Sequence, residues 1–180
     1  MGKRAETYRI IPFTEPMIVP FVGIIKKKDF NIEILLPFLT SLFSKNVVFS
    51  KTIPFSFTDY YEKEMGKNLE RLWIGFLKTF PLENSHIWKI VTNSIENFFK
   101  EDNKRTVNID PGYLSLNNII LFTTKNYTHR FYLGQSIYGE VTLIYKKGKL
   151  NKLEWTYPDY TEQIAIDFFN KLREFLKNAI

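Results

Sequence analysis

The chain has 180 residues, of which 44% are hydrophobic and 17% aromatic, and its formal net charge is +6. This apolar composition excludes an intrinsically disordered chain, and the length predicts one domain with a full hydrophobic core. The absence of cysteine excludes disulfides, thiolate metal ligands and a cysteine nucleophile. We therefore predict a single domain at residues 19–180, preceded by an irregular arm at residues 1–18.

The positive charge is spread along the whole sequence. Residues 1–60 carry eight basic and five acidic groups, 61–120 carry eight of each, and 121–180 carry nine and six. This even spread is only a weak indication of nucleic-acid binding, which favours basic groups gathered on one face. No apolar run approaches the roughly 20 residues of a membrane span, and no signal peptide is recognisable. We expect a soluble, cytoplasmic protein without a membrane partner.

The first half of the chain alternates between strand and helix patterns. β-Branched and aromatic residues predict a strand at 19–25, and apolar residues at helical spacing predict a helix after Asn31. Pro37 should kink that helix or divide it into two short ones, because proline lacks an N–H and clashes with the preceding turn. A second strand is predicted at 46–57 and a polar loop at 58–66.

A third strand is predicted at 69–80. Leu72, Ile74 and Phe76 share one of its faces, whereas Arg71 and Trp73 share the other.

The segment 81–103 has helical periodicity, and a strand, a turn and a strand are predicted at 104–125. The turn is assigned to Asp110-Pro111-Gly112-Tyr113, because proline and glycine suit the two central positions of a type II turn.

The last third of the chain predicts a meander and a final helix. Strands are expected at 130–133, 137–145 and 150–154. Asp159 is the predicted N-cap of the C-terminal helix, with Glu162 reaching back three residues later. The order strand, helix, strand, strand, helix, strand is that of ferredoxin-like βαββαβ folds. The predicted fold class is therefore α+β: a single domain with a largely antiparallel sheet, a ferredoxin-like start, an extra C-terminal β meander and a C-terminal helix. We expect all helices on one face of the sheet.

Several long segments resemble the uncharacterised prokaryotic domain of unknown function 4416 family. They are Pro54–Tyr61 with Glu64-Met65-Gly66, Val107–Leu114, Thr123-Thr124-Lys125, Tyr127, His129-Arg130, Tyr132-Leu133-Gly134, Ile137-Tyr138, Glu140–Leu143 and Trp155–Tyr160. The resemblance is nearly full length and implies no function. Ser56 stands where the family pattern has Asp, so we give position 56 no catalytic role, and Pro37 interrupts a helix that is continuous in relatives.

The candidate site lies between Asn108 and Lys147, where ionisable side chains interrupt strand-like segments. Lys125 and Arg130 are candidate ligands for an anion, since both suit phosphate or carboxylate. His129, Asp110 and Glu140 are the candidate catalytic residues for acid-base chemistry. Three further ligand-binding candidates are Asp59, Tyr60 and Tyr113.

Each of these groups also has a structural interpretation. Asp110 could serve only its turn, His129 could be a histidine at the edge of the core, and Glu140 could form an ion pair with Arg130 on the neighbouring strand.

No metal site is predicted. The chain has two histidines, and the acidic loop of Asp59, Glu62 and Glu64 matches no EF-hand. The motifs of P-loop, Rossmann, α/β-hydrolase and zinc-protease chemistry are absent, and the sequence indicates no particular cofactor.

Three functions remain open. The first is a small-ligand-binding protein or enzyme acting on a phosphorylated or carboxylated substrate. The second is a nucleic-acid-binding module that uses Trp155, Tyr157 and Tyr160 with Lys146, Lys147, Lys149 and Lys152. The third is a non-catalytic scaffold, for which a homodimer through the sheet edges is one form.

Overall fold

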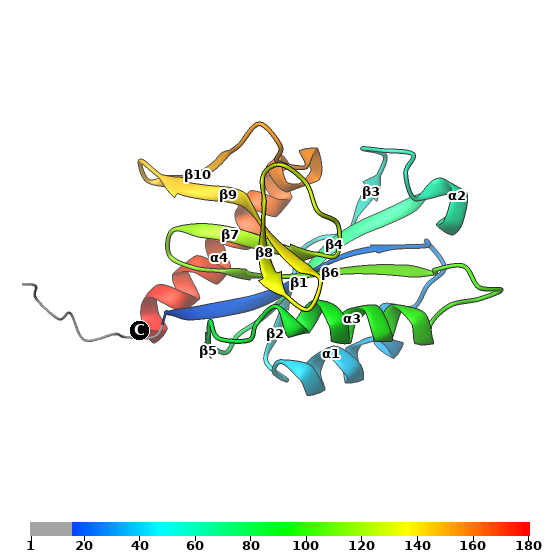
Figure 1. Cartoon of the computed structure of the whole chain (residues 1–180), viewed down its shortest axis with the longest axis horizontal. Coiled ribbons are helices and arrows are strands. Elements are labelled where there is room, and N and C mark those ends of the chain that lie inside the picture. Colours follow the sequence, from blue (N-terminus) through cyan, green and yellow to red (C-terminus); the bar gives the residue numbers. More distant parts are fainter. Residues whose placement is uncertain (1–15) are drawn as a thin grey trace, which may run out of the picture.

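Strand β1 (Met17–Lys26) is an inner strand of an antiparallel sheet in the computed structural model, which describes residues 16–180 (Figure 1). The other strands are β2 (Val47–Phe49), β3 (Ile53–Phe55), β4 (Leu69–Phe76), β5 (Phe80–Pro81), β6 (Val107–Leu114), β7 (Asn118–Thr123), β8 (Arg130–Gly134), β9 (Ile137–Lys146) and β10 (Lys149–Lys152). The helices are α1 (Leu36–Leu42), α2 (Glu62–Met65), α3 (Ile87–Phe98) and α4 (Gln163–Ala179), with 3-10 turns at Ile32–Ile34 and Pro158–Thr161. The strand order is β10-β9-β7-β6-β1-β4-β2; β3, β5 and β8 pair with β4, β1 and β9 respectively.

The order β6-β1-β4-β2 contains the ferredoxin-like unit that the sequence predicts. Its two helices, α1 and α3, pack on one face of the sheet through a core that includes Val22 and Ile24 of β1. The meander of β7, β9 and β10 extends the sheet beyond β6. The α+β class, the meander and the C-terminal helix are thus confirmed.

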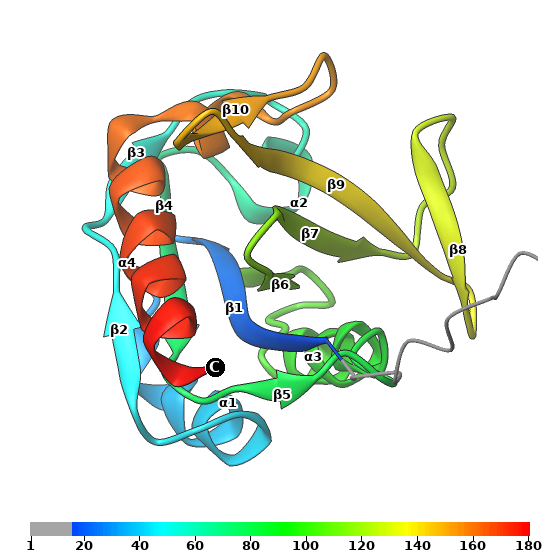
Figure 2. The ribbon, with the colours of Figure 1, turned by 90° about the vertical axis from the view of Figure 1, so that its left-hand side faces the viewer.

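The expectation that all helices lie on one face is wrong. Helix α4 covers the opposite face, where its Phe169 and Leu172 pack with Phe21 and Trp73 (Figure 2). The physical reason is visible in β1 and β4, whose alternate residues are apolar on both sides and so require cover on both faces. The C-terminal helix supplies the second cover.

Pro37 divides the first helical segment as predicted. Asn31 caps the 3-10 turn by accepting a hydrogen bond from the Glu33 N–H at 2.9 Å, and α1 then begins with Pro37 in its first turn. Proline is tolerated there because the first N–H groups of a helix have no intrahelical partner.

The segment Asp110-Pro111-Gly112-Tyr113 is not a turn, as the sequence suggested, but the middle of β6. Strand β1 pairs with all of β6, whereas β7 pairs only with residues 112–114, so the first part of β6 has a free edge on that side. Pro111 lies two residues after Ile109, so the backbone nitrogens of both residues point away from β1, as the Ile109 N–H does. The N–H that Pro111 lacks would therefore face the free edge, and no hydrogen bond of the sheet is lost. Gly112 is needed for close approach, because a Cβ there would lie 2.2 Å from the Ile120 carbonyl oxygen.

Four other boundaries differ from the predictions. The strand expected at 46–57 is broken into β2 and β3, which both pair with β4, and the loop at 58–66 contains the single turn of α2. Helix α3 ends at Phe98, short of residue 103. Asp159 does not cap α4, which begins after Glu162 without a side-chain cap; Asp159 is buried in the preceding 3-10 turn.

β1 begins at Met17, two residues before the predicted domain start, and residues 1–15 of the predicted arm lie outside the described residues.

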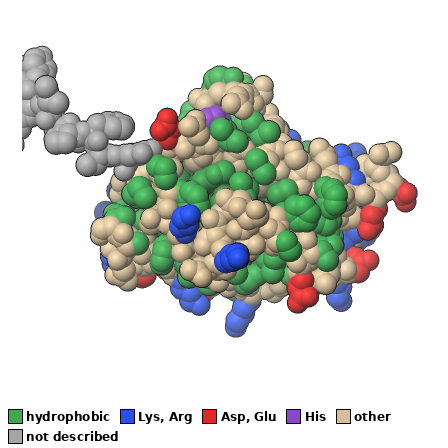
Figure 3. All heavy atoms as spheres, turned by 90° about the horizontal axis from the view of Figure 1, so that it is seen from below, with side chains coloured by type: hydrophobic (Ala, Val, Ile, Leu, Met, Phe, Trp, Pro, Cys, Tyr) green, Lys and Arg blue, Asp and Glu red, His purple; other side chains and the backbone are tan. Residues whose placement is uncertain are grey.

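The face covered by α1 and α3 presents a broad scatter of hydrophobic side chains to solvent (Figure 3). Phe38 of α1 and Phe98 of α3 contact each other there, with ring centroids 5.4 Å apart, and Phe98 is 70% exposed.

Candidate functional site

A pocket of about 500 Å³ opens where β7 separates from β6, and residues from both sides of the sheet line it. It is bounded by β4, α3, β6, β7, β9, the loop after β3 and the 3-10 turn before α4. Its charged and polar lining residues are Thr58, Tyr60, Tyr61, Arg71, Lys89, Asn93, Glu96, Arg105, Asn108, Asp110, Thr123, Thr124, Lys125, Arg130, Glu140, Tyr157, Asp159 and Tyr160. Apolar contact comes from Ile25, Phe55, Phe57, Leu121, Phe122 and Pro158.

Helix α3 satisfies the backbone groups that β7 leaves unpaired. The Ile109 N–H donates to Glu96 Oε1 at 2.7 Å, and the Ile109 carbonyl oxygen accepts from Lys89 Nζ at 3.0 Å. Both side chains are buried, and burial raises the pKa of Glu96. Two oppositely charged side chains of one helix therefore take the place of a neighbouring strand and hold the gap in the sheet open.

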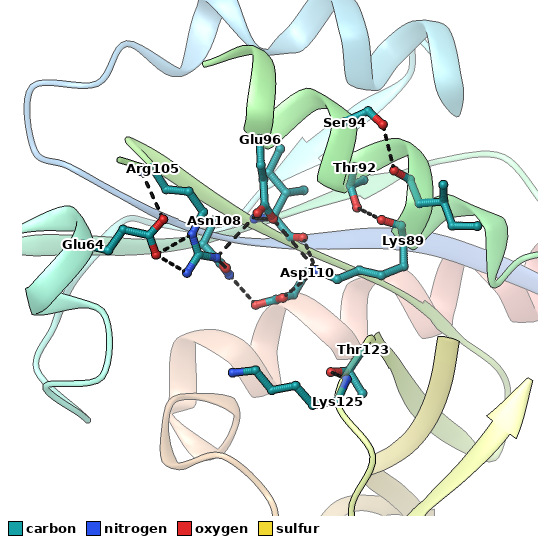
Figure 4. A network of polar contacts seen from close by, with 12 residues as sticks. Glu64, Lys89, Thr92, Ser94, Glu96, Arg105, Asn108, Asp110, Thr123 and Lys125 are labelled. Carbon is teal, nitrogen blue, oxygen red and sulfur yellow. Dashed lines mark hydrogen bonds and ion pairs between the residues drawn. The ribbon is translucent and has the colours of Figure 1, made fainter. Parts of the chain in front are cut away.

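Asp110 lies at the centre of a polar network in this gap (Figure 4). Lys89 donates to its Oδ1 at 3.2 Å and Asn108 donates to its Oδ2 at 2.7 Å. Arg105 donates to the Asn108 side-chain oxygen at 2.6 Å and to Glu64 of α2 through Nε and Nη2, which lowers the pKa of Glu64. Asp110 is thus oriented by two donors rather than by its own backbone, and the interpretation as a turn residue is wrong.

Arg71 is buried in the wall of the pocket with only 2% of its surface exposed. Its guanidinium lies 4.7 Å from the ring of Trp73 and 5.1 Å from the ring of Tyr160. Its Nε is 2.9 Å from Asp159 Oδ2, close enough for an ion pair but not aligned as a hydrogen bond, and its Nη1 has no hydrogen-bond partner.

Gly23 makes room for this arrangement, since a Cβ at residue 23 would lie 2.8 Å from both Arg71 Nη2 and the Tyr160 hydroxyl oxygen.

Glu140 is a buried carboxylate in the lining of the same pocket. Its Oε2 accepts from Arg130 Nε at 2.7 Å and lies 3.0 Å from His129 Nε2, whereas its buried Oε1 has no partner. The predicted ion pair between Arg130 and Glu140 is therefore present, across directly paired positions of β8 and β9. The ring of His129 stacks on Trp155 at 4.8 Å, and His129 contacts Glu140 without itself lining the pocket.

Two more lining groups lie at the mouth of the pocket. The ammonium of Lys125 contacts the hydroxyl and the ring of Tyr60 and forms no ion pair within residues 16–180. The Tyr157 hydroxyl accepts from Arg130 Nη2 at 2.9 Å. Burial, followed by the charge of Glu140, raises the pKa of Tyr157 to about 12, so its O–H stays a donor at neutral pH.

The pocket gathers five of the eight site residues that the sequence suggests: Tyr60, Asp110, Lys125, Arg130 and Glu140. His129 reaches the site only through Glu140. Asp59 and Tyr113 are outside the lining, and the Tyr113 ring packs against Phe122 in the core.

Sequence analysis missed the buried members of the site and one half-buried arginine, namely Arg71, Lys89, Glu96, Asn108, Asp159 and Tyr160 together with Arg105. The sequence did contain a signal for Arg71, because this arginine shares one face of its strand with the apolar residues Leu69 and Trp73. The others carry no local sign of their role, and long-range partners such as Glu64 for Arg105 and Asp110 for Lys89 cannot be read from a local pattern.

Within residues 16–180 no three histidine, cysteine, aspartate or glutamate side chains gather as they would around a metal ion. No helix in this range is both long and apolar enough to cross a membrane.

The fold and the site define an α+β domain with a charged pocket built into a gap in its sheet. The family model of a domain of unknown function, DUF4416, matches residues 16–175, and the chain belongs to this family. The resemblance inferred from the sequence is thereby confirmed. The searches of curated proteins and of solved structures gave no match.

Proposed function

We propose that the protein binds a small anionic ligand, phosphorylated or carboxylated, in the pocket between β6 and β7. The observation that carries this proposal is the buried guanidinium of Arg71, which faces the pocket and has an unpartnered Nη1. A buried polar group without a partner costs about 1–3 kcal/mol, and a charged one costs more. An anion with oxygen acceptors would remove that cost, because guanidinium groups suit phosphate and carboxylate.

The balance of charge also supports an anion. Five cations line the pocket against four carboxylates. Arg71, Lys89, Arg105 and Arg130 each face one of those carboxylates, namely Asp159, Asp110, Glu96 and Glu140. Lys125 is the cation in excess, and it lies at the mouth where an incoming anion would meet it.

Acid-base catalysis on the bound ligand is part of this proposal. Asp110 and Glu140 are the two carboxylates available for proton transfer, and His129 would act on Glu140 rather than on the ligand. Hydrogen bonds hold both carboxylates in place, as positioned proton acceptors require.

The nucleic-acid alternative has less support. Tyr160 is 1% exposed, and the ring of His129 covers one face of Trp155, so neither side chain is free to stack on a base from both sides. The four lysines around the β9–β10 hairpin are exposed, but none of them lines the pocket.

The test is calorimetric titration of the protein with phosphorylated and carboxylated compounds, comparing wild type with Lys125→Met and Lys147→Met. Both variants remove one exposed lysine and change the net charge equally, but only Lys125 lines the pocket. We expect Lys125→Met to weaken anion binding about fivefold to tenfold, which corresponds to about 1–1.4 kcal/mol, while Lys147→Met changes nothing. Equal effects of the two variants, or no binding of any anion to wild type, would contradict the proposal.

A further inference from the structure

The two oxygens of Glu140 have different roles. Oε2 accepts from Arg130 and contacts His129, whereas Oε1 belongs to the same 1%-exposed side chain of the pocket lining and has no hydrogen-bond partner. A carboxylate oxygen accepts hydrogen bonds and donates none. Whatever binds beside Glu140 is therefore selected for a hydrogen-bond donor at that point.

The neighbouring charges decide between a hydroxyl and an ammonium donor. The guanidinium of Arg130 already neutralises Glu140 at 2.7 Å, so a second cation in the same place would be repelled by Arg130. Arg130 also links Glu140 to the Tyr157 hydroxyl, which is a hydrogen-bond donor facing the same pocket. A ligand hydroxyl can donate to Glu140 and accept from Tyr157 at once, whereas an ammonium group has no acceptor.

Arg71 and Lys125 are the cations of the lining that would meet the anionic group of the ligand. Both line the same pocket, and Arg71 Nη1 is an unpartnered donor that is nine-tenths or more buried. A pocket of about 500 Å³ is large enough to enclose a small metabolite-sized molecule.

We infer that the ligand is a hydroxylated anion, whose phosphate or carboxylate meets Arg71 and Lys125 while a hydroxyl group donates to Glu140 Oε1. This inference rests on the proposed function and adds to it the class of ligand. Glu140 is then the residue that selects the hydroxyl group.

The test uses compounds matched in size that differ in their hydroxyl groups. Glycerol 3-phosphate is compared with propyl phosphate, and gluconate with hexanoate, by calorimetric titration of the full chain. A hydrogen bond to a charged acceptor predicts that the hydroxylated member of at least one pair binds tenfold or more tightly. The apolar hexanoate would gain more from burial alone, so a preference for gluconate cannot come from the hydrophobic effect.

The Glu140→Gln variant tests whether Glu140 is responsible for the preference for the hydroxylated compound. Arg130 Nε is a donor and requires an acceptor at the position of Oε2, so the amide N–H₂ takes the position of Oε1 and the acceptor there is lost. We expect the preference to fall below about threefold in this variant and to persist in Glu154→Gln, an exposed control outside the pocket.

The outcomes separate the two proposals. If the anions bind and members of each pair bind equally, the hydroxyl inference is wrong and anion binding stands. Tighter binding of 3-aminopropyl phosphate than of glycerol 3-phosphate would also overturn it, in favour of an ammonium donor. If none of the anions binds, the proposed function fails and the inference fails with it. The wild-type comparison decides these points even if Glu140→Gln does not fold.

Discussion

Replacing Arg71 by methionine should destabilise the protein strongly, because it leaves Asp159 buried without its cation. Arg71 is 2% exposed and the Asp159 side chain 6%, with 2.9 Å between Nε and Oδ2. Removing one member of a buried ion pair costs about 3–5 kcal/mol, and the lost contacts with the Trp73 and Tyr160 rings add about 1 kcal/mol. Methionine fills much of the volume, so we expect a loss of about 4 kcal/mol in the free energy of unfolding.

A double-mutant cycle with Asp159→Asn isolates the pair. The asparagine removes the charge at nearly constant volume, so the double variant should be more stable than the sum of the single effects predicts, with a coupling of about 2 kcal/mol or more. Urea unfolding followed by tryptophan fluorescence measures all four proteins, since Trp73 lies beside the guanidinium. Additive single effects, or a cost below about 1 kcal/mol for Arg71→Met, would refute the reasoning that the pair is buried and coupled.

Three further predictions concern the gap in the sheet and the buried tyrosines. Glu96→Ala leaves the Ile109 N–H without an acceptor and should lower the free energy of unfolding in urea by about 3 kcal/mol. Glu96→Gln keeps an acceptor and should lower it by about 1 kcal/mol. Equal losses would mean that the hydrogen bond to Ile109 contributes nothing. Gly112→Ala should lower the free energy of unfolding by about 3 kcal/mol or prevent folding, because the new Cβ would lie 2.2 Å from the Ile120 carbonyl oxygen. An unchanged thermal melt would show that β6 and β7 can separate at that position. Burial raises the pKa of Tyr61, Tyr113 and Tyr160 above 10.0. The unfolded chain therefore ionises at lower pH than the folded protein. The contribution of these tyrosines to the free energy of unfolding is complete below pH 10 and is lost as the pH rises towards their pKa values in the folded state. Tyrosinate absorbance at 295 nm should therefore rise later in the native than in the urea-unfolded protein; coincident titrations would contradict this burial.

The sequence by itself determined the elements whose signal is local. In β4 the alternation of Leu72, Ile74 and Phe76 with Trp73 correctly separates the two cores, because a strand sends successive side chains to opposite faces. The break at Pro37 and the final helix were predictable for the same reason, since their residues interact within one or two turns. The order of these elements was sufficient to predict the ferredoxin-like unit.

Tertiary structure alone decided where β6 loses its neighbour, and therefore where the pocket lies. Asp110-Pro111-Gly112 has the composition of a turn but lies in the middle of β6. Strand β7 does not pair with Pro111, whose edge of β6 is therefore free, whereas it pairs with Gly112 and brings the Ile120 carbonyl oxygen close to it. The pairs that build the site join residues far apart in the sequence, as with Arg71 and Asp159. The ion pair of Arg130 with Glu140 was predictable because it joins strands that are adjacent in the sequence. The burial and the pairing of residues in the wall of the pocket were not, because they depend on contacts between distant segments that no local pattern encodes.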